Sequence, residues 1–320
     1  MVSPPVGFRR RVCCRYPHLV AVTALSARSR TSAFVALTKP RIIELLLVST
    51  VPTMILAERG MPSLWLIVAT VVGGTFAAGG ANAINMYVDR DIDGEMERTK
   101  NRPLVTGEIQ PTEALVFAIG LEVVAFAWLW GFVNLLSALL AVAACLFYVF
   151  VYTIWLKRTS KQNIVIGGAA GAMPALIGWS SVTNTVELPA IILFLIVFFW
   201  TPPHFWALAI RYSDDYASAS VPMMPVVDGQ RSTARQILVY SLIVWAVSLW
   251  LWPAADMGWI YLVVAVGIGA MFSGGALQMV REPDPSRLEK LAIRYFSFSI
   301  THLTVLFGAI AIDQLVGWGV

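Results

Sequence analysis

Charged residues are scarce in this sequence. They make up 13% of the 320 residues, whereas 58% are apolar; an average soluble domain has about 25% charged residues. This balance excludes a water-soluble globule, and it excludes a disordered chain, which needs low hydrophobicity. Cysteine is nearly absent too: Cys13, Cys14 and Cys145 form no Cys-x-x-Cys pair. A disulfide scaffold and a zinc or redox site built on paired cysteines are therefore excluded.

Long apolar runs dominate what is present. A helix needs about 20 apolar residues to cross the hydrocarbon core of a bilayer, and runs of about that size recur nine times. The sequence therefore predicts an all-α polytopic membrane protein with nine transmembrane helices. The predicted spans are residues 42–58, 63–86, 112–131, 134–156, 164–182, 188–210, 235–254, 258–280 and 295–317.

The positive charges predict how these helices are oriented. All of the 23 Lys and Arg residues except Arg59 fall in the N-terminal segment or in loops on its side of the membrane. Because cytoplasmic loops carry an excess of Lys and Arg, we expect the N-terminus in the cytoplasm and the C-terminus outside. The expected location is the cell membrane, with the mitochondrial inner membrane as the alternative. The net charge of +4 then reflects topology, and nucleic-acid binding is not expected.

The N-terminal segment differs from the rest of the chain because it is basic and not continuously apolar. We expect residues 1–35 to form a disordered basic arm near lipid headgroups, with a targeting segment as the alternative. A single transmembrane domain is expected over residues 36–320.

Two long polar loops, after the second and sixth spans, share one pattern. Asn85, Asp89 and Asp93 are spaced four apart in the first loop, and Arg211 and Asp215 are spaced four apart in the second. A proline follows ten positions after the last aspartate in each loop. We therefore expect two four-helix pseudo-repeats plus a ninth helix, enclosing a central chamber with the functional site between the repeats.

The first loop has a chemical interpretation. Residues four apart share one helix face, and two carboxylates on that face repel each other unless a divalent cation lies between them. Oxygen ligands favour Mg²⁺, and the basic residues that follow can hold phosphate oxygens directly. The pattern predicts a site for a diphosphate and Mg²⁺, whereas ordinary solvated loop charges are the alternative. The basic residues are Arg98, Lys100 and Arg102.

At these residues the chain resembles the UbiA superfamily of intramembrane prenyltransferases. The resemblance rests on the stretches Thr38-Lys-Pro-Arg41, Asn82-Ala-Ile-Asn85-Met-Tyr-Val-Asp89-Arg-Asp-Ile-Asp93 and Trp200-Thr-Pro-Pro-His204-Phe-Trp-Ala-Leu-Ala-Ile-Arg211. It implies Mg²⁺ as cofactor and an isoprenyl diphosphate as substrate. The Pro-Pro-His segment resembles the heme-prenylating branch. That implies farnesyl transfer from farnesyl diphosphate to a vinyl group of heme b, giving heme O for heme-copper oxidases, with heme A synthase as a downstream partner.

The resemblance also implies roles for single residues. The expected catalytic residues are Asp89, Asp93, Asp215, Arg211 and His204, and the expected metal ligands are Asp89, Asp93, Asn85 and Asp215. The expected diphosphate contacts are Asn85, Arg98, Lys100, Arg102, Lys39 and Arg41, and the expected heme contacts are His204, Trp206 and Glu44. Other members carry a second Asp-x-x-x-Asp where Arg211 and Asp215 stand here. We therefore expect Arg211 to pair with diphosphate oxygens without a metal.

His204 lies seven residues before Arg211, two helical turns away on the same face. At about 1.5 Å per residue it should lie roughly 10 Å deeper, beneath the diphosphate. It would there serve as an axial ligand of heme iron or as a hydrogen-bonding group near the reacting vinyl. The structural alternative is that it satisfies carbonyl groups freed by Pro202 and Pro203.

Two other functions remain open from the sequence. A quinone or other aromatic acceptor would suit the same fold, although the Pro-Pro-His segment disfavours it. A membrane heme or lipid transporter would share the repeats and the apolar spans. A transporter does not need a carboxylate stripe that binds Mg²⁺, so diphosphate release separates it from a prenyltransferase.

Overall fold

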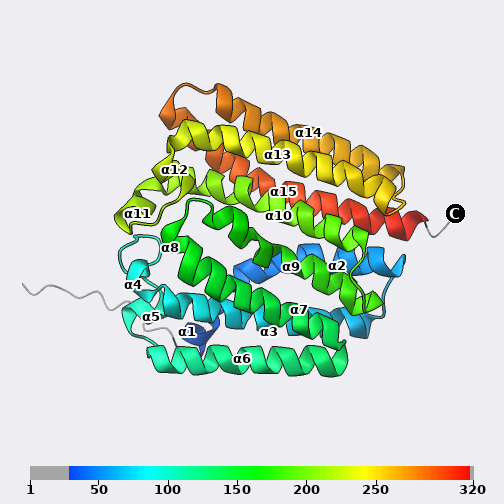
Figure 1. Cartoon of the computed structure of the whole chain (residues 1–320), viewed down its shortest axis with the longest axis horizontal. Helices are drawn as coiled ribbons and strands as arrows, with labels where there is room; N and C mark the ends of the chain where they lie inside the picture. Colours follow the sequence, from blue (N-terminus) through cyan, green and yellow to red (C-terminus); the bar gives the residue numbers. More distant parts are fainter. Residues whose placement is uncertain (1–28, 318–320) are drawn as a thin grey trace, which may run out of the picture.

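The computed structural model describes residues 29–317, apart from the side chains of residues 41–47. Every regular element in this part of the chain is a helix (Figure 1). The long helices are α2 (Pro40–Glu58), α3 (Leu64–Val88), α6 (Pro111–Phe132), α7 (Leu135–Leu146) continued by η1 (Phe147–Leu156), α9 (Asn163–Thr183), α10 (Leu188–Arg211), α13 (Gly229–Ala254), α14 (Trp259–Arg281) and α15 (Pro285–Gly317). The short ones are α1 (Arg30–Leu37), α4 (Arg90–Asp93), α5 (Pro103–Thr106), α8 (Lys157–Thr159), α11 (Ser213–Ser218) and α12 (Met224–Val227).

The predicted membrane spans correspond to the long helices. Within the described residues, eight helices are long and apolar enough to cross a bilayer. The remaining predicted span, residues 42–58, corresponds to α2, whose 19 residues reach about 28 Å. The all-α membrane fold is thus confirmed, and the protein is an integral membrane protein.

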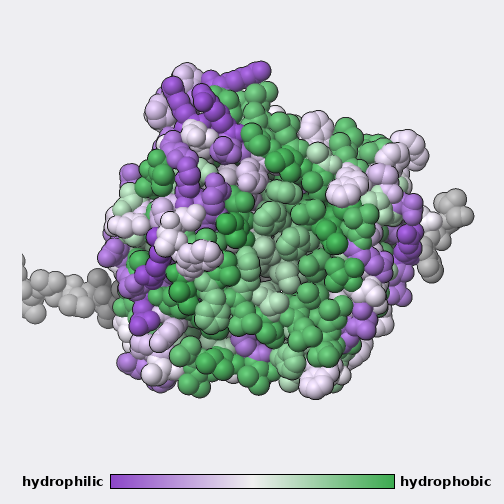
Figure 2. Space-filling view, viewed as in Figure 1, coloured by the Kyte–Doolittle hydropathy of each residue, from purple (hydrophilic) through white to green (hydrophobic). Residues whose placement is uncertain are grey.

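The helices form a bundle whose two ends differ (Figure 1). The short helices α4, α5, α8, α11 and α12 gather at one end, and the C-terminal end of α15 lies at the other. Helices α3, α6 and α7 lie on one side, α13 and α14 lie on the other, and α9 runs between them. Figure 2 shows apolar residues over the middle of this face and polar residues at its two ends, as expected for a surface that meets lipid.

Two helices begin earlier than the apolar pattern predicts, because polar turns extend them beyond the membrane. α13 begins at Gly229 and not at 235, and α15 begins at Pro285 and not at 295. At α15, Pro285 occupies the first turn and the Asp284 carboxylate accepts a hydrogen bond from the Ser286 amide at 2.9 Å. Both features favour a helix start there.

The predicted N-terminal arm ends within a helix. Residues 1–28 lie outside the described residues, but the last part of the arm belongs to α1. This helix packs on α6, with the rings of Phe34 and Phe117 5.0 Å apart and Arg30 paired with Glu113 at 2.7 Å. Leu37 is fully buried. Residues 30–35, which the sequence assigned to the arm, therefore belong to a helix that packs on the bundle.

Candidate active site

The predicted polar stripe persists in the structure as one buried column. Asn85 lies in the last turn of α3, Asp89 ends that helix, and Asp93 ends α4. The amide of Asp89 donates to the carbonyl of Asn85, and the amide of Asp93 donates to the carbonyl of Asp89, both at 2.9 Å. This helical register keeps the three side chains together although the chain changes from α3 to α4. Both carboxylates are fully buried, and Asn85 is nearly so.

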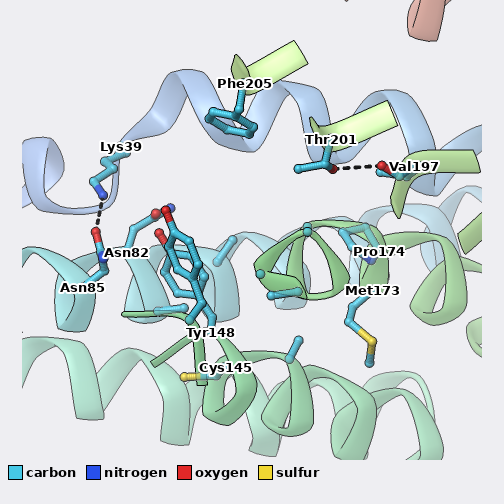
Figure 3. A pocket seen from close by; sticks show the side chains of 18 of the residues that line it. Lys39, Asn82, Asn85, Cys145, Tyr148, Met173, Pro174, Val197, Thr201 and Phe205 are labelled. Atoms are coloured by element: carbon cyan, nitrogen blue, oxygen red, sulfur yellow. Dashed lines mark hydrogen bonds between the residues drawn. The ribbon is translucent and has the colours of Figure 1, made fainter. Parts of the chain in front are cut away.

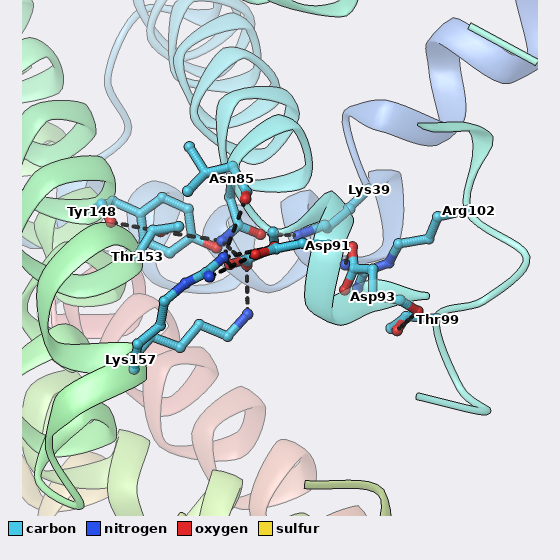
Figure 4. A network of polar contacts seen from close by, with 12 residues as sticks. Lys39, Asn85, Asp91, Asp93, Thr99, Arg102, Tyr148, Thr153 and Lys157 are labelled. Carbon is cyan, nitrogen blue, oxygen red and sulfur yellow. Dashed lines mark hydrogen bonds and ion pairs between the residues drawn. The ribbon is translucent and has the colours of Figure 1, made fainter. Parts of the chain in front are cut away.

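Cations from three other segments surround this column (Figure 4). Lys157 donates to Asp89 Oδ2 at 2.5 Å, and Arg102 donates to Asp93 Oδ2 at 2.5 Å. Lys39 donates to Asn85 Oδ1 at 2.7 Å. The Asn85 amide nitrogen in turn donates to Asp89 at 2.7 Å and to Thr153 at 3.1 Å. The site thus joins the start of α2, the end of α3, the loop before α5 and the end of η1.

Lys39 lies among two cations and the two carboxylates of the column. It has a left-handed backbone conformation, with φ 53°, between α1 and α2. Burial, together with the charges of Arg102 and Lys157, lowers its pKa to about 7. A bound anion would favour its charged form again, because an opposite charge stabilises an ammonium group.

Each carboxylate keeps one oxygen without a hydrogen-bond partner within the described part of the chain. These atoms, Asp89 Oδ1 and Asp93 Oδ1, are buried, and the Arg158 guanidinium lies 3.8 Å from Asp89 Oδ1. A buried unpaired carboxylate oxygen is costly. No group of three acidic, histidine or cysteine side chains that could hold a metal occurs among the described residues. Two carboxylates suit Mg²⁺ when substrate phosphates and water complete its shell, so the residues fit a metal that binds together with a diphosphate.

A cavity of about 370 Å³ opens directly below this column (Figure 3). Its polar end is lined by Lys39, Asn85, Asp93, Arg102 and Lys157. The charged side chains named here, acidic and basic, thus lie at the same end of the cavity. Its remaining wall is mainly apolar or small, with residues from α3, α7, η1, α9 and α10. These include Gly74, Ala77, Tyr148, Met173, Ile177, Val197 and Phe205. The shape suits a substrate with an anionic head and an apolar tail.

Comparisons with known proteins identify the family of this chain. The model of the UbiA prenyltransferase family matches residues 46–300. The chain belongs to this family. It is 55% identical over 290 residues to the protoheme IX farnesyltransferase of Parafrankia sp., covering 91% of this chain and 92% of that one. It is 54% identical over 294 residues to the enzyme of the same name from Frankia alni, covering 90% and 99%.

Solved structures share the fold at low sequence identity. A digeranylgeranylglyceryl phosphate synthase is similar with a TM-score of 0.74 and 16% identity, covering 90% of this chain and 99% of that one. A UbiA homolog from Archaeoglobus fulgidus bound to DMAPP and Mg²⁺ is similar with a TM-score of 0.59 and 17% identity, covering 86% and 100%. These likenesses support the helical architecture.

The predicted basic residues of this UbiA family member divide into two groups. Arg98 lines the cavity, and its guanidinium lies about 6 Å from the rings of Tyr212 and Tyr216. Lys100 instead pairs with Glu97 at 2.5 Å, and Arg211 pairs with Glu289 of α15. Neither Lys100 nor Arg211 is among the described residues that line the cavity. The prediction that Arg211 faces the diphosphate site is therefore not matched by the structure, because its side of α10 faces α15.

Asp215 is near the first loop without joining the carboxylate column. Its Oδ2 accepts a 3.4 Å hydrogen bond from the amide of Arg98, and its side chain is half-buried. The two polar loops therefore meet, as the repeat predicts. Among the described residues Asp215 makes no hydrogen bond with Asn85, Asp89 or Asp93, and its role as a fourth metal ligand remains a prediction.

The predicted heme residues of α10 also face away from the cavity. His204 Nδ1 shares a 2.6 Å hydrogen bond with Ser299 Oγ, and its ring stacks between Trp200 and Phe296. Trp206 is fully buried against Tyr240 of α13. His204 and Arg211 do share a face, as predicted, but this face packs on α15. The side chains of Arg41 and Glu44 lie outside the described residues.

Several residues of the site were not expected from the sequence. Lys157, Tyr148, Tyr152 and Thr153 all belong to η1 or the residue after it. η1 is a π-helix, in which the Thr153 hydroxyl donates to the carbonyl of Tyr148 at 2.8 Å, and π-helical turns occur often at functional sites. Lys157 directly follows an apolar run. Its positive charge is the one feature of the sequence that could have marked it as a site residue, but the excess of basic residues in cytoplasmic loops explains that charge equally well.

Proposed function

We propose that this protein transfers a farnesyl group from farnesyl diphosphate to a vinyl group of protoheme IX, giving heme O. The observation that carries the prenyl transfer is the buried column of Asp89 and Asp93, ringed by cations, above an apolar cavity. The identity of the acceptor is supported by relatives at 50–55% identity that carry the name protoheme IX farnesyltransferase.

Binding of the diphosphate would use the cations that line the polar end of the cavity. Lys39, Arg102 and Lys157 direct their donor groups toward the carboxylate column (Figure 4). Arg98 also lines the cavity. Lys157 and Arg102 are themselves paired with the two aspartates. We propose Asp89 and Asp93 as the ligands of Mg²⁺. When bound, the ion would neutralise the diphosphate and stabilise it as a leaving group.

The reaction breaks the bond between C1 of the farnesyl chain and the diphosphate oxygen, and the bonding electrons leave with the diphosphate. Lys39, Arg102 and Lys157 stabilise the charge that develops on the departing oxygen. The π electrons of the vinyl group then form the new carbon–carbon bond. Water adds to the cation left on the porphyrin side and loses a proton, which gives the hydroxyl group. The apolar cavity wall keeps water away from the allylic cation before it is captured.

We also propose that the protein lies in the cell membrane with its N-terminus in the cytoplasm. The end of the bundle that carries α4, α8 and α11 holds the site and most of the basic loop residues. Reporters fused after residue 320 and within the 157–161 loop should therefore lie on opposite sides. Two reporters on the same side of the membrane would contradict the odd number of predicted spans between the two fusion sites.

The activity is tested with the purified full chain, heme b, farnesyl diphosphate and Mg²⁺. We expect a pigment whose mass has increased by one farnesyl group and one hydroxyl group, together with release of diphosphate. A transporter would release no diphosphate. An enzyme for a quinone precursor would prenylate an aromatic acid in a parallel assay and leave heme unchanged.

A further inference from the structure

The Phe205 side chain on the cavity wall has a large exposed surface. α10 contributes Val197, Trp200, Thr201, Phe205 and Leu208 to the wall, and of its two aromatic side chains there Trp200 is only 2% exposed. Val197 and Thr201 are 5% and 8% exposed, whereas Phe205 is 40% exposed. A large apolar side chain that is open inside a cavity has contact area for a ligand.

Phe205 lies at the depth where the reacting carbon must be. Figure 3 shows its ring pointing from α10 into the cavity, opposite Tyr148. Both rings lie between the polar end, marked by Lys39 and Asn85, and the apolar end, marked by Met173. The ring therefore lies on the apolar side of the polar end that is proposed to hold the diphosphate.

The two facing rings differ in their partners. Tyr148 is already stacked on Tyr152, with centroids 5.4 Å apart and planes at 19°. Phe205 meets the ring of His204 at 5.0 Å, with the planes nearly perpendicular at 87°. Aromatic surfaces favour an offset or edge contact with another ring, and Phe205 has the exposed area to accept a flat ligand.

We propose that Phe205 is the acceptor-contacting ring of the site, on which the vinyl-bearing edge of the tetrapyrrole stacks beside C1 of the farnesyl chain. This inference rests on the proposed function, because it names the contact that binds its acceptor. The Pro-Pro-His-Phe segment then presents its phenylalanine to the acceptor, while its histidine is turned away. His204 acts as a positioning residue: its bond to Ser299 and its stacking on Phe296 fix the rotation of α10.

The experiment compares Phe205→Leu, Phe205→Trp and the matched control Phe198→Leu in the full-length protein. Phe198 lies two turns earlier on α10 and packs on Phe194 and Phe199. The apparent KM is measured separately for heme and for farnesyl diphosphate. Heme affinity is measured independently, by titration of the heme Soret band without farnesyl diphosphate.

Phe205→Leu should raise the KM and Kd for heme about tenfold, as expected for the loss of a ring contact and its apolar area. Phe205→Trp should restore most of the affinity, because it keeps an aromatic face. The KM for farnesyl diphosphate should change by less than about twofold in both variants, and Phe198→Leu should match the wild type in both constants. His204→Ala should leave the Soret wavelength of bound heme unchanged, because His204 does not ligate the iron.

Unchanged heme affinity in Phe205→Leu would overturn the proposal. So would a rise in the KM for farnesyl diphosphate alone, which would place the ring against the prenyl chain. A Soret shift in His204→Ala would return the histidine to the heme. If the wild type bound heme without prenylating it, the proposed function would fail, and the Soret titration would still decide the role of Phe205.

Discussion

Asp93 and Asp91 provide a matched pair of acids two residues apart on α4. The Asp93 side chain is fully buried, is paired with Arg102 and has one oxygen without a described partner. The Asp91 side chain is 58% exposed and pairs with Arg158 at 2.7 Å. Because Arg158 donates to it, the pKa of Asp91 is lowered to about 2. Only Asp93 lines the cavity among these two acids.

The two substitutions to asparagine should therefore differ strongly. A unit charge about 4 Å from another contributes about 4 kcal/mol at an effective dielectric constant of about 20, which corresponds to about a thousandfold in rate. We expect Asp93→Asn to lower kcat/KM by at least about that factor, since the charge it removes pairs with Arg102 and would face the proposed Mg²⁺. Asp91→Asn removes an exposed ion pair, which contributes about 0–1 kcal/mol, so its kcat/KM should fall by about fivefold at most.

The assay follows the mass of the pigment at limiting Mg²⁺, with both variants in the same membrane preparation. Folding is checked by the melting temperature of each purified variant. Activities of the two variants within about tenfold of each other, with both proteins folded, would refute the assignment of Asp93 to the metal–diphosphate site. The depressed pKa of Asp91 means that its ion pair is lost only as the pH falls through about 2, so the comparison holds across neutral pH.

Three further substitutions test neighbouring parts of the structure. Lys157→Met should raise the KM for farnesyl diphosphate more than that for heme, because Lys157 is paired with the carboxylate column at its polar end; the reverse order would remove it from the diphosphate site. Asp313→Ala should lower stability by about 1–3 kcal/mol, since its carboxylate accepts two amide hydrogen bonds at the start of α14, at 2.6 and 3.1 Å, and thermal unfolding in detergent measures the loss. Gly167→Ala should impair turnover because its new methyl group would lie 2.2 Å from the Tyr152 ring, whereas Gly120→Ala, which meets nothing within 4 Å and lies outside the cavity wall, should be tolerated; equal turnover of the two would contradict this packing.

The fold could be predicted from the sequence because long apolar runs leave few alternatives in a bilayer. The carboxylate column could be predicted as well, since Asn85, Asp89 and Asp93 are local and keep their helical register. Lys157 could not be predicted in this way. It reaches Asp89 across 68 positions of sequence, and only the packing of η1 beside α3 brings the two together.

Helical periodicity also explains why His204 was misplaced. Spacing correctly gives His204 and Arg211 one common face, but spacing says nothing about which neighbour that face meets. The hydrogen bond to Ser299 and the pairing of Arg211 with Glu289 both turn this face toward α15. The cavity consequently receives the adjacent face with Thr201 and Phe205.

The π-helical geometry of η1 determines in which direction Lys157, the residue after it, points. An α-helix turns by about 100° per residue, and a π-helix, with its i→i+5 hydrogen bonds, turns by less, so letting residues 147–156 relax into an α-helix with no residue removed would rotate everything after them. Lys157 would then point away from Asp89, while the span would remain long enough for the membrane. A protein in which this stretch is α-helical could keep its hydropathy profile, its topology and both aspartates, and still lack the cation that faces them.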